Sequence, residues 1–330
     1  MKKRMVSGIK PTGALTLGNY IGAIKQFIQY QDEYELYVFL ADLHALTLPM
    51  DISCDELRQN SEDILAIYLA CGLDPKKVVI FKQSDVHEHA ELGYLMACHS
   101  YMGELQRMTQ FKDKTQKMKN ENIPAGIFIY PTLMAADILL YQAQYVPVGV
   151  DQKQHVELTR NLVLRMNHLY KKELFVLPEP VLAKQGAKIT SLANPTKKMS
   201  KSESDKGTIY LLEDLSITRK KIMSAVTDSE NEIRYDVENK PGISNLLTIL
   251  SVLTNQSIET LQQKYQKVGY GTFKKEVADV VCSELEMLQQ KVQKIKESHL
   301  LESILQQGAK KASTIAKQTL NEVYQTLGIK

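Results

Sequence analysis

Two stretches of this chain combine residue types that suit a phosphorylated ligand. The first, residues 7–20, places glycines at positions 8, 13 and 18 between a short apolar strand and a helical pattern. The second, residues 197–202, reads Lys-Lys-Met-Ser-Lys-Ser. Glycines let a backbone approach a ligand closely, and amides at a helix start carry partial positive charge. Each stretch alone is also typical of a fold connection or a solvated loop. The hypothesis of an anion-binding site therefore rests on the two stretches together.

A third feature is a lone acid on an apolar helical face. Residues 130–141 repeat apolar side chains at helical spacing, and Pro131 fits the first turn of such a helix. Asp137 is the only acid on that face. A buried carboxylate needs a hydrogen-bond donor, because burial without one is costly or leads to protonation. The sequence leaves two donors open: a lysine or arginine of the protein, or an N–H of a largely apolar ligand.

Alternating strands and helices must position these residues. Near-continuous apolar runs predict buried parallel strands at 4–7, 35–41, 78–81 and 145–149, with helical patterns between them. This alternation predicts a right-handed, parallel α/β sheet, which binds ligands at the carboxyl ends of its strands. His44, Asp151 and Gln152 each follow such an end. A packed histidine and a helix N-cap are the structural alternatives for these positions.

The second half of the chain changes to helices alone. Six lysines between positions 184 and 206 mark the boundary, and apolar residues then recur at helical spacing from 273 to 295 and from about 309 to 327. We therefore predict a parallel-sheet domain followed by an all-helical one.

Composition excludes several classes of protein. The chain has 330 residues, 44% of them hydrophobic, and a net charge of +3, which is compatible with a polyanionic partner but does not show one. Its four cysteines form no C-x-x-C pair, so neither a protein-bound metal nor an iron–sulfur cluster is expected. No signal-peptide pattern and no run of about 18 apolar residues occurs, so we expect a cytoplasmic protein without a membrane partner.

The two anion-type stretches together resemble the paired signature of class I aminoacyl-tRNA synthetases. The HIGH motif corresponds to Thr-Leu-Gly-Asn at 16–19, and KMSKS is matched letter for letter at 198–202. Over nearly its full length the chain is similar to the bacterial-type tryptophanyl-tRNA synthetases. The blocks that carry this resemblance are Ser-Gly-Ile-Lys-Pro-Thr-Gly at 7–13, Ala-Asp-Leu-His-Ala-Leu-Thr at 41–47, Gly-Glu-Leu-Gln-Arg-Met-Thr-Gln-Phe-Lys at 103–112, Leu-Met-Ala-Ala-Asp-Ile-Leu at 133–139, Val-Pro-Val-Gly-Val-Asp-Gln-Lys-Gln-His at 146–155, Ala-Val-Thr-Asp-Ser-Glu at 225–230 and Lys-Pro-Gly-Ile-Ser-Asn-Leu-Leu at 240–247.

The resemblance implies a tryptophan site. Asp137 would accept the indole N–H, and Tyr130 with Gln152 would hold the polar end of the amino acid. An unpaired carboxylate would then discriminate against amino acids that lack the N–H. The other residues that the resemblance assigns to this site are Gly8, His44, Met134, Val146 and Val148.

The resemblance also implies an ATP site, with Mg²⁺ as part of the substrate. Tryptophan would attack the α-phosphorus, and the adenylate would then react with tRNA(Trp). Lys112, Lys198 and Lys201 would stabilise the leaving pyrophosphate, with Thr16 and Asn19 replacing the two histidines of HIGH. Lys10 stands where relatives carry Gln, and Val150 where an acid is usual. The remaining ATP residues implied are Pro11, Thr12, Gly18, Gly149, Asp151, Ile189, Met199, Ser200 and Ser202.

The implied architecture is a Rossmann-like (HUP-type) catalytic domain at 1–192 and a KMSKS loop with a helical anticodon-binding domain at 193–299. The last helix, about 300–330, would pack back on the catalytic domain, and the protein would be a homodimer. Three alternatives remain: a tyrosyl-tRNA synthetase, which shares the sheet and both signatures; a non-catalytic RNA-binding paralogue; and a small-metabolite nucleotidyltransferase, which would have no use for the helical half.

Overall fold

The core of the molecule is a five-stranded parallel sheet with the order β3-β2-β1-β4-β5. A computed structural model describes residues 2–47, 53–116, 118, 122–182, 188–199 and 206–329. The predicted α/β class is confirmed, and the order is that of an open, doubly wound sheet. The strands are β1 (Arg4–Ile9), β2 (Glu35–Leu40), β3 (Val79–Lys82), β4 (Tyr145–Val148) and β5 (Glu179–Leu182).

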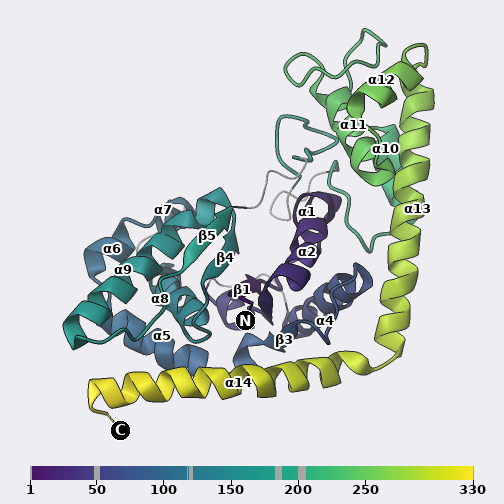
Figure 1. Cartoon of the computed structure of the whole chain (residues 1–330). Coiled ribbons are helices and arrows are strands. Elements are labelled where there is room, and N and C mark those ends of the chain that lie inside the picture. Colours follow the sequence, from purple (N-terminus) through teal and green to yellow (C-terminus); the bar gives the residue numbers. More distant parts are fainter. Residues whose placement is uncertain are drawn as a thin grey trace.

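Helices cover both faces of this sheet (Figure 1). Alternate strand residues point to opposite faces, so Val38 and its neighbour Phe39 belong to different buried clusters: that of Val38 includes residues of α2 and α4, and that of Phe39 residues of α5 and α8. The helices of this part are α1 (Leu17–Asn19), α2 (Lys25–Glu33), α3 (Asp42–Ala45), α4 (Cys54–Ala70), α5 (Glu88–His99), α6 (Met102–Gln106), α7 (Thr109–Thr115), α8 (Ala125–Leu139) and α9 (Lys153–Tyr170), with a π-helical segment at Tyr20–Ile24 and short 3₁₀ turns at Gln83–Asp85 and Val150–Gln152.

Local sequence explains where two of these helices begin. Ser53 and Glu56 form the predicted capping box: Glu56 N–H donates to Ser53 Oγ, and Ser53 N–H donates to Glu56 Oε2. The expected position of Pro131 was wrong, because α8 already begins at Ala125, directly after Pro124. Pro131 therefore lies inside α8, where it contributes no backbone N–H to the helix.

The helical half extends from the sheet along α13 (Figure 1). α13 carries a small group of helices at its far end and then turns into α14, which runs back under the sheet against β3. Among the described residues, no helix is long and apolar enough to cross a membrane. The helices are α10 (Leu215–Met223), α11 (Pro241–Thr254), α12 (Ile258–Tyr265), α13 (Tyr270–Glu297) and α14 (Leu300–Leu327).

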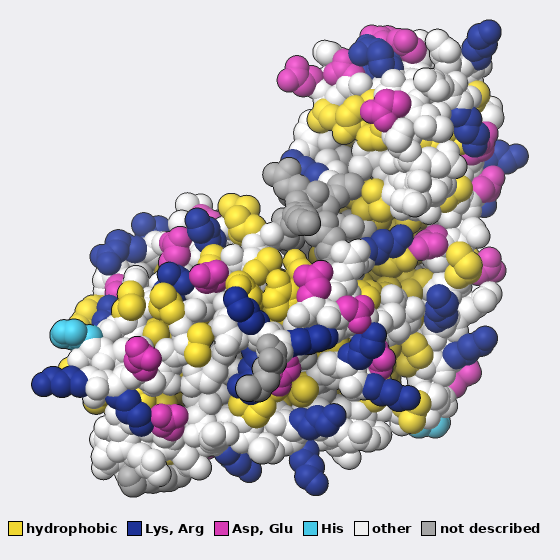
Figure 2. All heavy atoms as spheres, in the orientation of Figure 1, with side chains coloured by type: hydrophobic (Ala, Val, Ile, Leu, Met, Phe, Trp, Pro, Cys, Tyr) yellow, Lys and Arg dark blue, Asp and Glu magenta, His cyan; other side chains and the backbone are white. Residues whose placement is uncertain are grey.

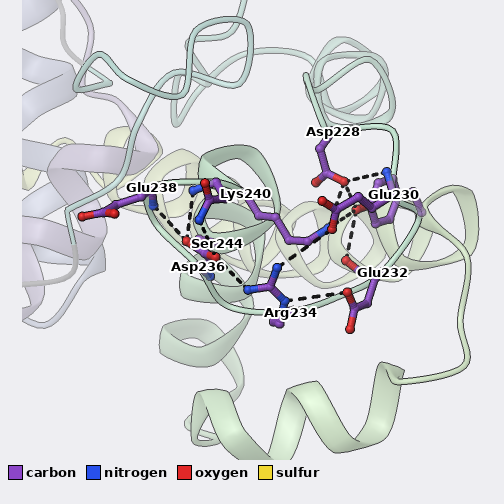
Figure 3. Close-up of polar contacts among 10 residues, drawn as sticks. Asp228, Glu230, Glu232, Arg234, Asp236, Glu238, Lys240 and Ser244 are labelled. Atoms are coloured by element: carbon purple, nitrogen blue, oxygen red, sulfur yellow. Dashed lines mark hydrogen bonds and ion pairs between the residues drawn. The ribbon is translucent and has the colours of Figure 1, made fainter.

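A buried lysine anchors the start of α11 (Figure 3). The side chain of Lys240 is fully buried, and its Nζ atom lies 2.9 Å from Asp228 Oδ1 and 2.7 Å from Glu230 Oε2. Burial by itself would lower the pKa of Lys240, but the hydrogen bonds that its ammonium group donates to these carboxylates keep the pKa above its ordinary value. The second turn of α11 contacts the segment that precedes KMSKS, where the Asn245 amide pairs with both backbone groups of Thr190.

A glycine of α14 packs directly against the sheet. A Cβ atom at Gly308 would lie 1.7 Å from the carbonyl oxygen of Ile80, so the helix can touch β3 only without a side chain there. We expect Gly308→Ala to lower the free energy of unfolding by about 1–3 kcal/mol, because the helix must move off the strand. Thermal and urea denaturation measure this loss.

The matched control is Gly271→Ala in α13. No atom lies within 4 Å of a Cβ at Gly271, so the helical preference of alanine should leave stability unchanged or raise it by about 0.5–1 kcal/mol. Equal effects of the two substitutions would contradict the packing argument.

Candidate active site

A cleft opens at the carboxyl ends of the central strands. It lies where the chain order reverses between β1 and β4, the position at which open α/β sheets bind ligands. The cleft has a volume of about 180 Å³ and is walled by both apolar and polar side chains. Its lining residues are Val6, Ser7, Gly8, Lys10, Phe39, Ala41, His44, Thr47, Gln110, Lys114, Tyr130, Met134, Asp137, Ile138, Val146, Pro147, Val148, Gln152 and His155.

Asp137 of α8 is the buried acid of this cleft. Its side chain is 3% exposed, and its carboxylate accepts hydrogen bonds from three protein groups. His44 Nε2 lies 2.7 Å from Oδ2, while Gln83 Nε2 at 2.7 Å and His89 Nδ1 at 2.6 Å share Oδ1. Of the two alternatives that the sequence left open, a lysine or arginine donor is not what the structure shows: two histidines and an amide of the protein donate.

These donors decide the charge of Asp137. Burial by itself would raise the pKa of this carboxyl, but the charge of His44 and the hydrogen bonds from His44 and His89 outweigh it and lower the pKa to about 2. Asp137 is thus an ionised acceptor at neutral pH, at the wall of a largely apolar cleft.

The structure brings all eight residues that the resemblance assigns to tryptophan to this cleft. Gly8 comes from the end of β1, and a Cβ there would lie 2.6 Å from Phe39 Cζ, so only glycine fits. Their assignment to tryptophan stays a prediction. The eight are Gly8, His44, Tyr130, Met134, Asp137, Val146, Val148 and Gln152.

Tyr130 is held by a histidine that the sequence did not single out. The Tyr130 hydroxyl lies 2.5 Å from Nε2 of His155, which is buried at the start of α9. Burial raises the pKa of Tyr130, so its phenol stays neutral and donates to His155. The Tyr130 oxygen keeps its acceptor capacity, which suits an ammonium group.

The burial of His155 predicts a pH dependence of stability. Burial, with the nearby charge of Lys114, lowers the pKa of His155 to about 4, below the value of about 6.5 in an unfolded chain. The unfolded state therefore binds more protons between these values, and stability falls as the pH falls from about 6.5 to about 4. We expect the wild type to lose about 3 kcal/mol more than His155→Gln across this window. Urea denaturation at pH 7 and pH 4 checks this; parallel curves for the two proteins would contradict it.

Two ammonium groups line the same cleft. Lys10 follows β1, and Lys114 comes from α7. Burial lowers the pKa of each, and the charge of Lys114 lowers that of Lys10 further, while Asp151 partly offsets the effect at Lys114. Neither group forms an ion pair with a described carboxylate. Two uncompensated cations in one cleft suit a polyanionic ligand.

Lys112, which was expected to reach the phosphates, is exposed and does not line the cleft. Gln110 and Lys114 are four residues apart and share one face of α7, whereas Lys112 lies two residues from each and faces the other way. The phosphate role of Lys112 therefore stays a prediction, while Lys114 is the lysine of α7 that lines the cleft.

The HIGH-like and KMSKS stretches meet in the structure. A Cβ at Gly18 would lie 3.0 Å from the carbonyl oxygen of Met199, so the α1 turn packs directly against KMSKS. Met199 N–H donates to the Ile189 carbonyl, and the exposed Lys198 pairs with Thr190. Ser200, Lys201 and Ser202 lie outside the described residues.

Thr16 and Asn19 cap the start of α1. They form a capping box: the Asn19 N–H donates to Thr16 Oγ1, and the Thr16 N–H donates to Asn19 Oδ1. Thr16 is completely buried and its hydroxyl also donates to Asn19. In this structure the Thr16 hydroxyl proton is thus used within the capping box, and the donation from Thr16 to phosphate stays a prediction.

The other residues implied for ATP lie around the cleft without lining it. Pro11 is buried and Thr12 half-buried in the turn after β1. Gly149, Val150 and Asp151 follow Val148 and are exposed, and Asp151 accepts a hydrogen bond from Gln110 Nε2 at 3.2 Å. Among the described side chains, no three His, Cys, Asp or Glu residues are grouped so that they could hold a metal ion.

Sequence reasoning missed several residues of this site. Gln83 and His89 follow the predicted strand 78–81, and the rule that ligands bind at carboxyl ends of strands was the signal that could have found them. Lys114 could have been found from its spacing, because it lies four residues after Gln110 and therefore on the same face of the helix. His155 carried no distinguishing signal beyond its place after β4.

Comparison with known proteins extends this picture. Residues 1–286 match the model of the family described as tRNA synthetases class I (W and Y). A tryptophan–tRNA ligase of Malacoplasma penetrans is 51% identical over 331 aligned positions, which cover 99% of this chain and 98% of the relative.

Solved structures agree with the sequence comparison. A tryptophanyl-tRNA synthetase of Mycoplasma pneumoniae superposes with a TM-score of 0.87 at 40% identity, covering 100% of this chain and 99% of that one. The enzyme of Campylobacter jejuni, solved in complex with ADP and tryptophan, superposes with a TM-score of 0.86 at 37% identity, covering 98% of this chain and 99% of that one.

Proposed function

We propose the following reaction from the premise that this chain belongs to the class I tRNA synthetases of the tryptophan and tyrosine family. The chain acts as a tryptophan–tRNA ligase, as its full-length relatives do. It is thus an enzyme that activates tryptophan with ATP and transfers it to tRNA(Trp). The roles of single residues, set out below, are our proposal.

The observation that carries the proposal is an ionised acid in an apolar cleft. Asp137 accepts the indole N–H, while Met134, Val146 and Val148 contact the ring and Gly8 leaves room for it. The hydroxyl oxygen of Tyr130 accepts from the ammonium group, and Gln152 lies beside it at the same wall. A carboxylate left unpaired discriminates against side chains without a donor at this position.

Two lysines and two backbone turns form the proposed ATP site. Lys10 and Lys114 stabilise the phosphates, and the turn at Gly18 with Met199, Ile189 and Lys198 forms the opposite side. We assign Lys201 with Ser200 and Ser202 to the same phosphates from the KMSKS pattern. Mg²⁺ enters with ATP as part of the substrate and neutralises phosphate charge.

The chemistry needs no protein nucleophile. A carboxylate oxygen of tryptophan attacks the α-phosphorus, forming a P–O bond as the bond to pyrophosphate breaks. A terminal ribose hydroxyl of the tRNA then attacks the acyl carbon, loses its proton and releases AMP. The protein positions these groups and stabilises the charge that grows on the leaving pyrophosphate, which is the work of Lys114 and its neighbours.

We assign the two halves of the chain to two tasks. Residues 1–192, with the last helix from about 300, form the catalytic domain, and 193–299 form the KMSKS loop and the anticodon-binding part. The length of α13 supports this, because it holds α10–α12 away from the sheet (Figure 1).

On the face shown in Figure 2, Lys and Arg side chains are interspersed with Asp and Glu, so this face presents no single basic RNA surface. We place the enzyme in the cytoplasm, where its substrates are.

The enzyme is proposed to be a homodimer. An apolar groove between α3, α5 and α8 is lined by side chains that monomers rarely expose together, with Leu46, Tyr94 and Ile129 exposed by 61%, 70% and 45%. A second copy of this chain is the proposed occupant. Tyr94→Glu should then give a monomer in sedimentation experiments, and an unchanged dimer would contradict this surface.

Tryptophan-dependent ATP–pyrophosphate exchange tests the function. We expect exchange with tryptophan and none with tyrosine, and tryptophan should raise the melting temperature where tyrosine does not. Stabilisation by tyrosine alone would indicate a tyrosyl enzyme. Binding of tRNA without any exchange would indicate a non-catalytic paralogue.

A further inference from the structure

The carboxylate of Asp137 has one acceptor position left. Two carboxylate oxygens offer about four lone-pair positions in total. The described protein groups fill three of them: Gln83 and His89 occupy both positions on Oδ1, and His44 occupies one on Oδ2. The open position therefore belongs to Oδ2, the oxygen shared with His44 of the cleft wall.

His89 is fixed in one protonation pattern. An ionised carboxylate only accepts, so Nδ1 of His89 carries the proton that it shares with Asp137. Its Nε2 lies 2.7 Å from the hydroxyl of Tyr141, a neutral phenol that can donate a hydrogen bond. In the neutral imidazole that donates from Nδ1, Nε2 is the acceptor, so the Tyr141 hydroxyl donates to it and favours this tautomer.

Packing fixes the ring of His89 as well. The residue is 0% exposed, and its ring lies 5.4 Å from the ring of Phe39 and 5.9 Å from that of Phe81, centroid to centroid. Tyr141 is itself stacked on Tyr37 at 4.9 Å. Rotation of the imidazole away from Asp137 would need movement of several core aromatics.

We propose that His89, oriented by Tyr141, is the positioning residue that makes Asp137 selective for a substrate with one ring N–H. By filling Oδ1 together with Gln83, it turns a carboxylate with four acceptor positions into one with a single open position. This inference rests on the proposed function and deepens it, because neither His89 nor Tyr141 lines the cleft.

Exchange kinetics with a matched analogue test the proposal. The analogue is the tryptophan isostere whose ring N–H is replaced by sulfur, 3-(benzothiophen-3-yl)alanine. We expect His89→Leu to lower the preference for tryptophan over the analogue, as a ratio of kcat/KM, by about 10–100-fold. KM for tryptophan should rise, while KM for ATP stays within about twofold. His89→Asn should recover most of the preference, because its amide places a donor where Nδ1 was.

Two further variants keep the test decisive. Tyr141→Phe preserves the ring and removes only the bond to Nε2, so it should lower the preference by about 3–10-fold even if His89→Leu does not fold. The control is His99→Leu, which removes a histidine of the same helix that contacts Tyr170 rather than the site. An unchanged preference in both His89→Leu and Tyr141→Phe, or an equal loss in His99→Leu, would overturn the proposal. Absence of exchange in the wild type would instead refute the proposed function.

Discussion

Asp137→Asn is expected to lower kcat/KM for tryptophan in ATP–pyrophosphate exchange by about 10²–10³. The substitution removes the charged acceptor of the indole N–H. The amide oxygen of Asn keeps the two donors Gln83 and His89, so its –NH₂ group faces the indole N–H and His44. A hydrogen bond to a charged group contributes about 1.5–3 kcal/mol, and a buried donor left unpaired costs about 1–3 kcal/mol more. Together these account for a loss of that size.

The measurement separates substrate binding from general damage. KM for ATP should stay within about twofold, because Lys10 and Lys114 are untouched, and the sulfur analogue should be affected less than tryptophan. A variant with kcat/KM for tryptophan within threefold of the wild type would contradict the role of Asp137. Equal losses for tryptophan and the analogue would show that the effect is structural.

The sheet could be predicted because its signals are local. Buried parallel strands are apolar runs, and β1 to β4 lie within a few residues of the predicted ranges. β5 escaped prediction because it is an exposed edge strand that contains Pro180, which neither periodicity nor composition distinguishes from a loop. The start of α8 was predicted too late for a similar reason. Pro131 is typical of a first helical turn, but the proline that precedes the helix is Pro124.

The partners of Asp137 could not be predicted because they come from three separate segments. His44 follows β2, Gln83 follows β3 and His89 lies in α5, so their meeting depends on how the strands are ordered in the sheet. The sequence does show that a buried acid needs a donor. It cannot show whether that donor is a ligand or a protein group until the distant segments are placed in space.

Thr16 and Asn19 show a different limit. Their resemblance to a catalytic signature suggested donors to phosphate, but their spacing of three is also that of a capping box. The structure shows that the box forms and that Thr16 is completely buried. The same spacing thus fits a helix cap and a catalytic signature, and the catalytic roles of Thr16 and Asn19 stay a prediction.

The second large effect is expected for Lys114→Ala, which should lower kcat for adenylate formation by about 10²-fold or more. Removal of one preorganised group that stabilises charge in a transition state costs about 10²–10³ in kcat. Lys114 is such a group: it lines the cleft beside Lys10, without an ion pair to a described carboxylate. Tryptophan binding should change little, since Asp137 and its donors are unaffected, and equilibrium titration with tryptophan measures this.

Lys112→Ala is the matched control for this variant. Both lysines belong to α7 and both substitutions remove one charge, but only Lys114 lies on the face that lines the cleft. Long-range electrostatics would affect the two variants alike, whereas direct contact with phosphate would affect only Lys114→Ala. Exchange rates for Lys112→Ala within about twofold of the wild type would therefore support a contact role for Lys114. A loss in Lys112→Ala with none in Lys114→Ala would show instead that α7 turns its other face to ATP.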